Sequence, residues 1–203
     1  NGREIDSSTK WMADDRHIVI YYLNEAHDEI YFVTSTPEPD YNTESWSTTG
    51  DMDELRRAYK GFHPEVQAVL EACPTAHKWA LVSREPLPTW HKGRIALLGD
   101  ACHTMSPSMA RGAGMAIEDA WVLAASLQQQ DIEPGLQAYS ARRLPRATRV
   151  QAASQANTSR YHMQSGALRF ARHMALRSAG VLARDALLSR LDWLYGHDVT
   201  RTV

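Results

Sequence analysis

The chain of 203 residues carries 22 Lys and Arg against 24 Asp and Glu, a formal net charge of −2, and 43% of its residues are hydrophobic. This balance is typical of a globular protein and excludes collagen, coiled coils, intrinsic disorder and small disulfide-stapled scaffolds. The longest apolar runs are too short to span a bilayer, so no membrane partner is expected. Two distant cysteines, Cys73 and Cys102, favour a reducing, cytoplasmic compartment and provide no zinc site.

Charge is distributed unevenly along the chain. Residues 1–60 hold thirteen acids and six bases, whereas residues 136–190 hold ten arginines and one acid. A basic helical region can bind nucleic acid, but aromatic residues are rare between these arginines and no recognition motif occurs. We favour a solvated helix face whose counter-charges lie elsewhere in the fold, and we expect no nucleic-acid partner.

The first third of the chain is predicted to form a small sheet. Residues 16–23 and 28–34 are rich in β-branched and aromatic side chains, and the short polar segment between them indicates an antiparallel hairpin. Prolines mark residues 37–50 as an exposed loop. Residues 79–82 are predicted to form a further strand.

Helices are predicted on both sides of one short apolar run. Asp51 caps a first helix, and a second begins at Pro64 and ends near Pro74. Residues 94–98 are continuously apolar after Arg94, a pattern typical of a strand buried in a parallel sheet. The remaining helices are expected from Gly112 or Gly114 to Leu127, from 136 to 144, from Pro145 to about 164, and, as an amphipathic run, from 167 to 193.

The segment from Gly93 to Leu127 combines an acid at the end of a strand with small residues at the start of a helix. Ligands of open α/β sheets bind at the carboxyl ends of strands, and helix N-termini favour negative charge. Asp100 and the Gly112-Ala113-Gly114 helix start therefore indicate a polyol-like or nucleotide-like cofactor. The alternative is that Gly99-Asp100 is a simple turn and that the glycines only permit close packing.

This segment, GRIALLGDACHTMSPSMARGAGMAIEDAWVLAASL, resembles the second flavin-contact motif of the class A FAD-dependent aromatic monooxygenases, of the salicylate hydroxylase and 6-hydroxynicotinate 3-monooxygenase type. The residues that match the family pattern are Gly99, Asp100, Ala101, His103, Pro107, Gly112, Gly114, Glu118 and Asp119. The resemblance extends over nearly the whole chain. It implies an α+β and α/β fold, in which an antiparallel substrate-domain sheet joins the returning strand and helices of a Rossmann-like FAD-binding domain, as in a truncated p-hydroxybenzoate hydroxylase.

The family resemblance also implies a division of the chain. Residues 1–91 would be the C-terminal part of the substrate-binding domain, 92–165 the FAD-domain return strand, flavin-contact loop and helices, and 166–203 a C-terminal helical segment. The family's G-x-G-x-x-G turn and its Asp-Gly motif do not occur in this sequence. We therefore expect the chain to correspond to the C-terminal half of the family fold, and to bind FAD weakly and be inactive without an N-terminal piece.

The resemblance assigns cofactor contacts to five residues. Asp100 would accept hydrogen bonds from the ribityl or ribose hydroxyls of FAD, and Pro107 would lie against the isoalloxazine. The backbone N–H groups of Gly112, Ala113 and Gly114 would face the pyrimidine edge. NADH or NADPH would reduce the flavin, and O2 would add to it as a flavin hydroperoxide.

Three further residues of the motif are expected to be structural. Glu118 and Asp119 are interpreted as helix-terminus charge and packing. His103 is interpreted as a structural hydrogen-bonding group near the loop rather than as a base.

Candidate substrate residues come from a strand and from the departures from the family pattern. His17 and Tyr21 are four apart on a strand and share one face, and the resemblance implies that both line the substrate pocket as catalytic and binding residues. The alternative is an exposed sheet face. Ser108 replaces a family His and is a candidate for substrate binding, Ser8 replaces a Cys, and Arg111 replaces a Gln. Arg111 would pair with a substrate carboxylate or a flavin phosphate, or lie on the surface.

The implied function is hydroxylation of a hydroxylated aromatic or N-heteroaromatic carboxylate by an enzyme that uses FAD, NADH or NADPH, and O2. Its partner would be a small aromatic substrate, and a homodimer is left open. The alternative is a non-catalytic ligand-binding relative that kept the fold. A metal enzyme and a Ser-His-Asp hydrolase are disfavoured, because neither a matched His pair nor a GxSxG motif occurs.

Overall fold

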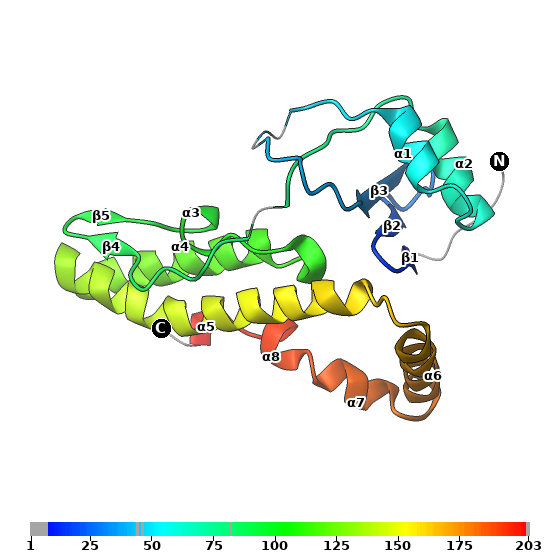
Figure 1. Cartoon of the computed structure of the whole chain (residues 1–203). Helices are drawn as coiled ribbons and strands as arrows, with labels where there is room; N and C mark the ends of the chain where they lie inside the picture. The colour runs from blue at the N-terminus through cyan, green and yellow to red at the C-terminus, as the bar shows by residue number, and fades with distance from the viewer. Residues whose placement is uncertain (1–7, 44, 46, 82, 202–203) are drawn as a thin grey trace. The chain divides into compact units, whose positions relative to one another are not determined.

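The computed structural model describes residues 8–43, 45, 47–81 and 83–201. It divides the chain into two compact units (Figure 1). The sheet unit comprises the residues up to 81 together with 161–166, and the helical unit comprises residues 82–160 and the residues from 167 onward.

The sheet unit contains one antiparallel sheet of three strands in the order β1-β2-β3. The strands are β1 (Ser8–Met12), β2 (His17–Tyr22) and β3 (Ile30–Ser35), and Tyr22 lies opposite Ile30 at the hairpin. The predicted hairpin is therefore confirmed. Strand β1 was not predicted, because its short sequence mixes polar and apolar residues and becomes a strand by pairing with β2.

Two helices follow, as predicted: α1 (Met52–Ala58) and α2 (Pro64–Ala72). The Asp51 side chain caps α1 by accepting hydrogen bonds from the N–H groups of Asp53 and Glu54, at 2.8 and 3.0 Å. The strand predicted at residues 79–82 is wrong over the described residues 79–81, and residue 82 lies outside the description. Among the described residues of this region, strand-like pairing consists of one bridge, between Thr49 and His77.

The core of the sheet unit lies on one side of the sheet. Ile18 and Ile20 of β2 are fully buried, and they pack with Tyr59, Val66 and Leu70. Because side chains alternate along a strand, the odd-numbered residues of β2 project to the opposite face. The hydrophobic pattern of β2 thus decides which residues remain outside the core.

In the helical unit, the prediction of a buried parallel strand over residues 94–98 is wrong. The strands β4 (His91–Lys92) and β5 (Ile95–Ala96) form a short antiparallel hairpin instead. Ile95 is 73% exposed and Leu98 is 41% exposed. A continuous apolar run is buried on both faces only where parallel neighbours flank it, and no described strand runs parallel to this one.

Helices make up most of the helical unit. The short elements α3 (Asp100–His103) and η1 (Pro107–Met109) precede two long helices, α4 (Gly112–Gln129) and α5 (Ile132–Tyr161). The prediction that Pro145 starts a new helix is wrong, because α5 continues through it. Pro145 and Ala141, whose carbonyl loses its partner, are both exposed, so water can satisfy the freed group.

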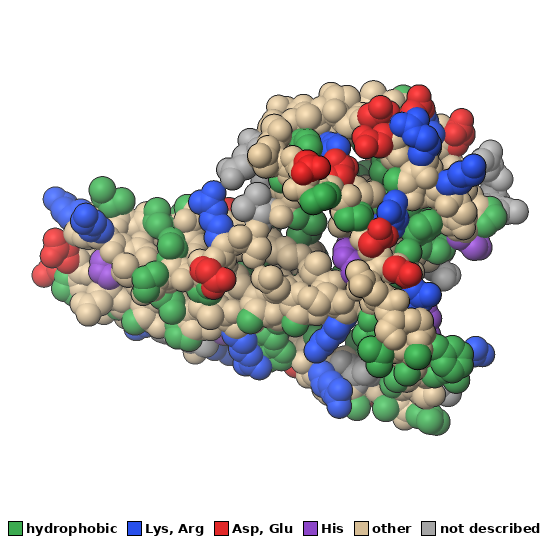
Figure 2. Space-filling model, in the orientation of Figure 1, with side chains coloured by type: hydrophobic (Ala, Val, Ile, Leu, Met, Phe, Trp, Pro, Cys, Tyr) green, Lys and Arg blue, Asp and Glu red, His purple; other side chains and the backbone are tan. Residues whose placement is uncertain are grey.

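The predicted helical run from 167 to 193 is divided into three helices. These are α6 (Gly166–Leu182), α7 (Arg184–Ser189) and α8 (Asp192–Tyr195), followed by η2 (Val199–Arg201). Hydrophobic side chains gather on the surface over α6 (Figure 2), and the exposed ones are Leu168, Phe170, Met174, Leu176 and Leu182. Among the described helices, none has a stretch long and apolar enough to cross a membrane.

The core of the helical unit joins the hairpin, the loop and the long helices. Its buried members are Trp90, Cys102, Met109, Met115, Val122, Tyr139, Ala147, Val150 and Leu194. The Tyr139 hydroxyl donates a hydrogen bond of 3.0 Å to the carbonyl of Leu97, so α5 also holds the segment after β5. The whole described chain is a mixed α+β fold with small antiparallel sheets, which agrees with the predicted class.

Candidate functional site

The turn before Asp100 depends on a glycine. Gly99 has a φ of 61°, a conformation that L side chains rarely adopt, and a Cβ there would lie 3.2 Å from Ala116 of α4. The Gly99 N–H donates a hydrogen bond of 3.0 Å to the Asp119 carboxylate. These contacts place the start of α3 against α4 and leave Asp100 exposed.

Asp119 anchors three parts of the helical unit through its buried carboxylate. His103 Nε2 lies 2.5 Å from Oδ2, and Arg143 Nε of α5 donates to Oδ1 at 2.7 Å. Burial raises the pKa of this carboxyl, but the hydrogen bonds from His103, Gly99 and Arg143 outweigh it, and the pKa is lowered. The interpretation of His103 as a structural hydrogen-bonding group agrees with this geometry.

Glu118 forms a second buried ion-pair centre with three arginines. Arg143 Nη1 and Arg146 Nε each donate to Oε2 at 2.7 Å, and Arg111 Nη2 donates to Oε1 at 2.6 Å. Burial opposes ionisation, yet the hydrogen bonds from Arg146 and Arg143 lower the pKa of Glu118 to about 2. Arg146 also donates to the carbonyls of Trp193 and Leu194, so the network reaches α8.

This network corrects two interpretations made from the sequence. Arg143 is only 2% exposed and Arg146 is partly buried, so these two do not belong to a solvated helix face. Glu118 and Asp119 lie two turns into α4, so they are packing charges rather than helix-terminus charges. Sequence spacing did not reveal the pairs, because 24 to 28 residues separate the partners.

The loop between α3 and η1 is held along one face of α5. The groups that bond to α5 include the Thr104 carbonyl, the Ser106 hydroxyl, and the hydroxyl and carbonyl of Ser108. Their partners are three or four residues apart in pairs along the helix: Gln151, Ser154, Asn157 and Thr158. The Ser108 hydroxyl donates a hydrogen bond of 2.5 Å to the Ser154 carbonyl.

The start of α4 leaves backbone donors available. The first helical bond runs from the Met115 N–H to the Arg111 carbonyl at 2.8 Å, so the N–H groups of Gly112, Ala113 and Gly114 have no acceptor within the helix. A Cβ at Gly112 would meet nothing within 4 Å. At Gly114 it would meet the Arg111 guanidinium at 3.2 Å, so this glycine makes room for the pair with Glu118.

The flavin-contact residues predicted from the sequence therefore share one scaffold. Asp100, Pro107 and Ala113 are exposed. Ala113 lies on α4 itself, and hydrogen bonds made by Gly99 and Ser108 hold the elements of Asp100 and Pro107 to α4 and α5. An exposed carboxylate, an exposed proline and free first-turn N–H groups suit hydroxyls, a flat ring and an anionic edge. The residues present fit one side of a flavin nucleotide, and no residue of the chain matches the fingerprint for its diphosphate.

Distance alone would allow a metal at Cys102, His103 and Asp119, whose ligand atoms all lie within 4.8 Å of one another. Both oxygens of Asp119 already accept hydrogen bonds, one of them from an arginine. Burial and the nearby Asp119 charge raise the pKa of the Cys102 thiol to about 12, which disfavours the thiolate that a metal ion would need. This donor set is structural rather than metal-binding.

In the sheet unit, His17 and Tyr21 lie on the face of the sheet opposite the core. His17 Nδ1 lies 2.9 Å from His162 Nε2, and the His17 and Tyr161 rings form an edge-type contact with 5.3 Å between their centroids. The Tyr21 ring lies 5.4 Å from that of Tyr31 on the neighbouring strand. Their roles as substrate residues remain predictions.

Ionisation on this face is suppressed by burial. Burial, assisted by the charges of His162 and Lys10, lowers the pKa of His17 to about 4. Burial also raises the pKa of the Tyr21 phenol. At neutral pH both side chains are therefore uncharged, and each can donate or accept a hydrogen bond.

Sequence reasoning missed three groups on this face: Lys10, Tyr161 and His162. Lys10 could have been placed on this face only from the pairing of β1 with β2, and β1 was not predicted. Tyr161 and His162 lie about 140 residues further along the chain, and no local pattern connects them with His17.

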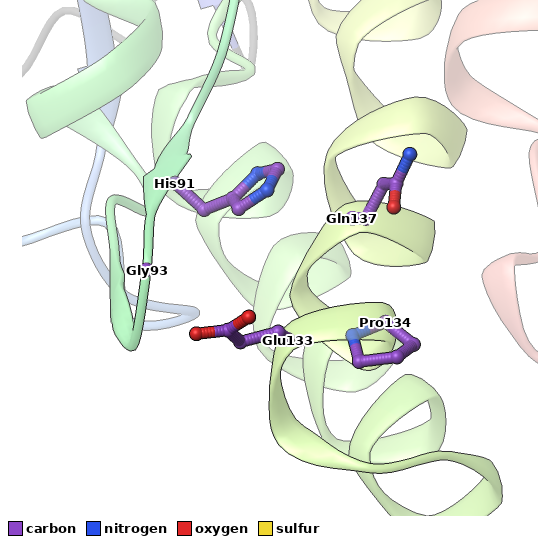
Figure 3. Close-up of a pocket in the computed structure, with 5 residues that line it drawn as sticks. All are labelled: His91, Gly93, Glu133, Pro134 and Gln137. Carbon is purple, nitrogen blue, oxygen red and sulfur yellow. The ribbon is translucent and has the colours of Figure 1, made fainter.

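An open pocket of the helical unit lies beside the β4–β5 hairpin. Figure 3 shows His91 and Gly93 on the hairpin facing Glu133, Pro134 and Gln137 of α5. His91 Nδ1 is 3.0 Å from the Ser140 hydroxyl. None of the predicted flavin or substrate residues lines this pocket, and it is assigned no role.

Comparison with known proteins shows the family to which the chain belongs. The FAD binding domain family matches residues 4–154, which include the loop, both long helices in large part and the sheet. The chain belongs to this family. Its relatives are class A FAD-dependent aromatic monooxygenases, as the motif from Gly93 to Leu127 predicted.

Several of the similar curated proteins have aromatic or heteroaromatic substrates in their names. The chain is 47% identical to 6-hydroxynicotinate 3-monooxygenase of Bordetella bronchiseptica over 75% of its own length and 41% of that protein. It is 30% identical to a salicylate hydroxylase of Pseudomonas putida, over 96% and 45%. The chain thus spans about half the length of the curated relatives it matches.

Solved structures confirm the fold. A salicylate hydroxylase substrate complex matches 96% of the chain and 48% of its own, with a TM-score of 0.74 and 24% identity. Klebsiella pneumoniae HpxO complexed with FAD and uric acid matches 86% and 46%, with a TM-score of 0.67 and 24% identity. The chain therefore has the p-hydroxybenzoate hydroxylase-like fold of FAD-dependent hydroxylases over the part that it covers.

Proposed function

We propose that the protein hydroxylates a hydroxylated aromatic or N-heteroaromatic carboxylate, using FAD, reduced nicotinamide and O2. The observation that carries this proposal is the flavin-contact loop, which presents Asp100 and Pro107 from a scaffold of buried ion pairs. Membership of the FAD binding domain family supports the cofactor, and the names of the relatives support the substrate class.

The helical unit would hold one side of the cofactor. Asp100 would accept hydrogen bonds from ribityl or ribose hydroxyls, and Pro107 would lie against the isoalloxazine ring. The N–H groups of Gly112, Ala113 and Gly114 would stabilise negative charge on its pyrimidine edge. When bound and reduced by a nicotinamide, FAD supplies the oxygen-activating chemistry.

The sheet unit would position the substrate. Tyr21 would exchange a hydrogen bond with the ring hydroxyl, since its phenol stays protonated at neutral pH. His17 is neutral, so its imidazole can accept a proton from that hydroxyl, and His162 holds its other nitrogen. Electron density released to the ring favours attack by an electrophilic oxygen.

The test is made on the protein expressed from its complete gene and supplied with FAD. We expect hydroxylated aromatic acids to stimulate the oxidation of NADH or NADPH and to yield a hydroxylated product identified by mass spectrometry. Tight binding of such acids without product or stimulated oxidation would reject the hydroxylase and favour a ligand-binding relative. Comparing NADH with NADPH identifies the reductant.

The assignment of the cofactor residues has a separate test. Asp100→Asn keeps the size of the side chain and removes the charge of the acceptor, and we expect FAD affinity to fall about tenfold. Glu133→Gln, an exposed acid elsewhere in the helical unit, is the matched control and should not change it. Flavin fluorescence titration measures both, and equal affinities would remove Asp100 from the site.

A further inference from the structure

The face of the sheet that carries His17 and Tyr21 also carries a lysine with no role in the proposed function. Lys10 lies opposite Val19, and Val19 separates His17 from Tyr21 on the same side of β2. Trp11, the next residue of β1, packs against the core on the other side of the sheet. Alternation therefore directs Lys10 to the face of His17 and Tyr21.

The ammonium group of Lys10 is held over an aromatic ring. Its Nζ lies 3.7 Å from the centroid of the Tyr161 ring, and the same ring contacts His17. A cation over an aromatic face is attracted by the ring while its N–H donors stay available to an anion. The Tyr161 ring therefore contacts both the Lys10 ammonium group and His17, the predicted substrate residue.

The charge of Lys10 has no counter-ion among the described residues. Asp15, on the turn between β1 and β2, is bound to Arg16 by hydrogen bonds of 2.7 and 2.8 Å. His17 adds no positive charge at neutral pH, because burial holds it neutral. Lys10 alone has a permanent charge among the residues that the register places on this face, which are Ser8, Lys10, Met12, His17, Val19, Tyr21, Tyr31, Val33 and Ser35.

A half-buried lysine without a carboxylate partner attracts an anion to the surface around it. The other cation considered for this role, Arg111, is already bound to Glu118 at 2.6 Å. Arg143 and Arg146 are likewise engaged with Glu118. Unlike these three arginines, Lys10 has no carboxylate partner among the described residues.

We propose that Lys10 binds the carboxylate of the aromatic substrate and thereby selects hydroxylated aromatic acids over the corresponding phenols. This inference rests on the proposed function, because it uses the same sheet face as the substrate site. Lys10 takes the carboxylate, and Tyr21 and His17 take the ring hydroxyl. The residue determines specificity, and the oxygen transfer does not pass through it.

The test compares two acids, salicylate and 6-hydroxynicotinate, with phenol and 2-hydroxypyridine, which lack the carboxylate. Isothermal titration calorimetry is done on the FAD-loaded protein expressed from its complete gene, as wild type, Lys10→Met and Lys10→Arg. Lys60→Met, which changes an exposed lysine of the same unit, is the control. We expect Lys10→Met to weaken binding of the acid about tenfold or more and Lys10→Arg to keep most of it.

The outcomes separate this inference from the proposed function. Lys10→Met should bind phenol and 2-hydroxypyridine as tightly as the wild type does. This unchanged binding would also show that the variant is folded. Equal acid affinity in wild type and Lys10→Met would overturn the role of Lys10 and leave the proposed hydroxylase intact. Equal losses for acid and phenol would also overturn it, and failure of the wild type to bind any of the four would reject the substrate face itself.

Discussion

The two units of this protein hold their charged side chains in opposite ways. In the helical unit, Glu118 and Asp119 are buried, and each carboxylate meets an arginine within 2.7 Å. In the sheet unit, Lys10 lies over a ring with no described carboxylate beside it. Paired buried charges stabilise a scaffold, whereas an unpaired charge on a half-buried face is available to a ligand.

The same contrast separates two histidines. His103 is fully buried and bonded to the Asp119 carboxylate, so its hydrogen-bonding capacity serves the loop that carries Asp100. His17 is bonded to another imidazole and lies close enough to Lys10 for that charge to affect it. Residue type alone therefore does not distinguish a histidine that supports the scaffold from one proposed to face the substrate; the partners of each side chain distinguish them.

The largest expected effect comes from removing the centre of the buried network. Asp119→Ala leaves the Arg143 charge and the His103 ring without their acceptor, and we expect the free energy of unfolding to fall by about 3–5 kcal/mol. Asp100→Asn, at an exposed acid of the same loop, should change it by less than about 0.5 kcal/mol. Urea unfolding followed by circular dichroism measures both, and equal effects would mean that Asp119 is not an anchor.

Acid should weaken the helical unit through Glu118. Its pKa is about 2 in the folded chain against 4.5 as the ordinary value, so the unfolded chain binds more protons between these pH values. Stability is therefore complete above pH 4.5 and falls as the pH approaches 2, by roughly 3 kcal/mol from this group. The slope of unfolding free energy against pH should be smaller in Glu118→Gln, and an unchanged slope would contradict the assignment.

His17 should remain neutral well into the acid range. Its pKa is about 4 rather than 6.5, because burial disfavours the charged ring. This lowered pKa contributes stability that is present above pH 6.5 and is lost as the pH falls toward 4. Titration of the histidine side chains by nitrogen NMR, with His17→Gln to assign the signal, measures it. A midpoint near 6.5 would show that the sheet face is open to water.

The smallest expected effect concerns the hydrogen bonds between the segment of residues 104–108 and helix α5. Ser108→Ala removes the hydrogen bond to the Ser154 carbonyl, and we expect a loss of about 1 kcal/mol in the free energy of unfolding. Ser178→Ala, at an exposed position of α6, is the control and should have almost no effect. A loss in acid binding without a loss in stability would instead assign Ser108 to the substrate.

Much of the architecture could be predicted from local pattern. Alternation predicted the β2–β3 hairpin, Asp51 predicted the start of α1, and the glycine-rich motif predicted α4. The predictions failed where a neighbour decides the outcome. The apolar run that ends at Leu98 contributes to an antiparallel hairpin, because it has no parallel neighbours among the described strands. Pro145 lies inside helix α5, because the Ala141 carbonyl that loses its partner is exposed to water.

The sequence by itself determined the family, the cofactor motif around Asp100 and the pairing of His17 with Tyr21 on one face. These depend on spacing within one element or on a contiguous motif. Only the tertiary structure decided that Arg143 is bound to buried carboxylates, whereas Lys10 lies over an aromatic ring. Their partners lie 24 and 151 residues away in the sequence. Charge is a property of a residue, but whether that charge is neutralised depends on which distant groups folding brings within a few ångströms.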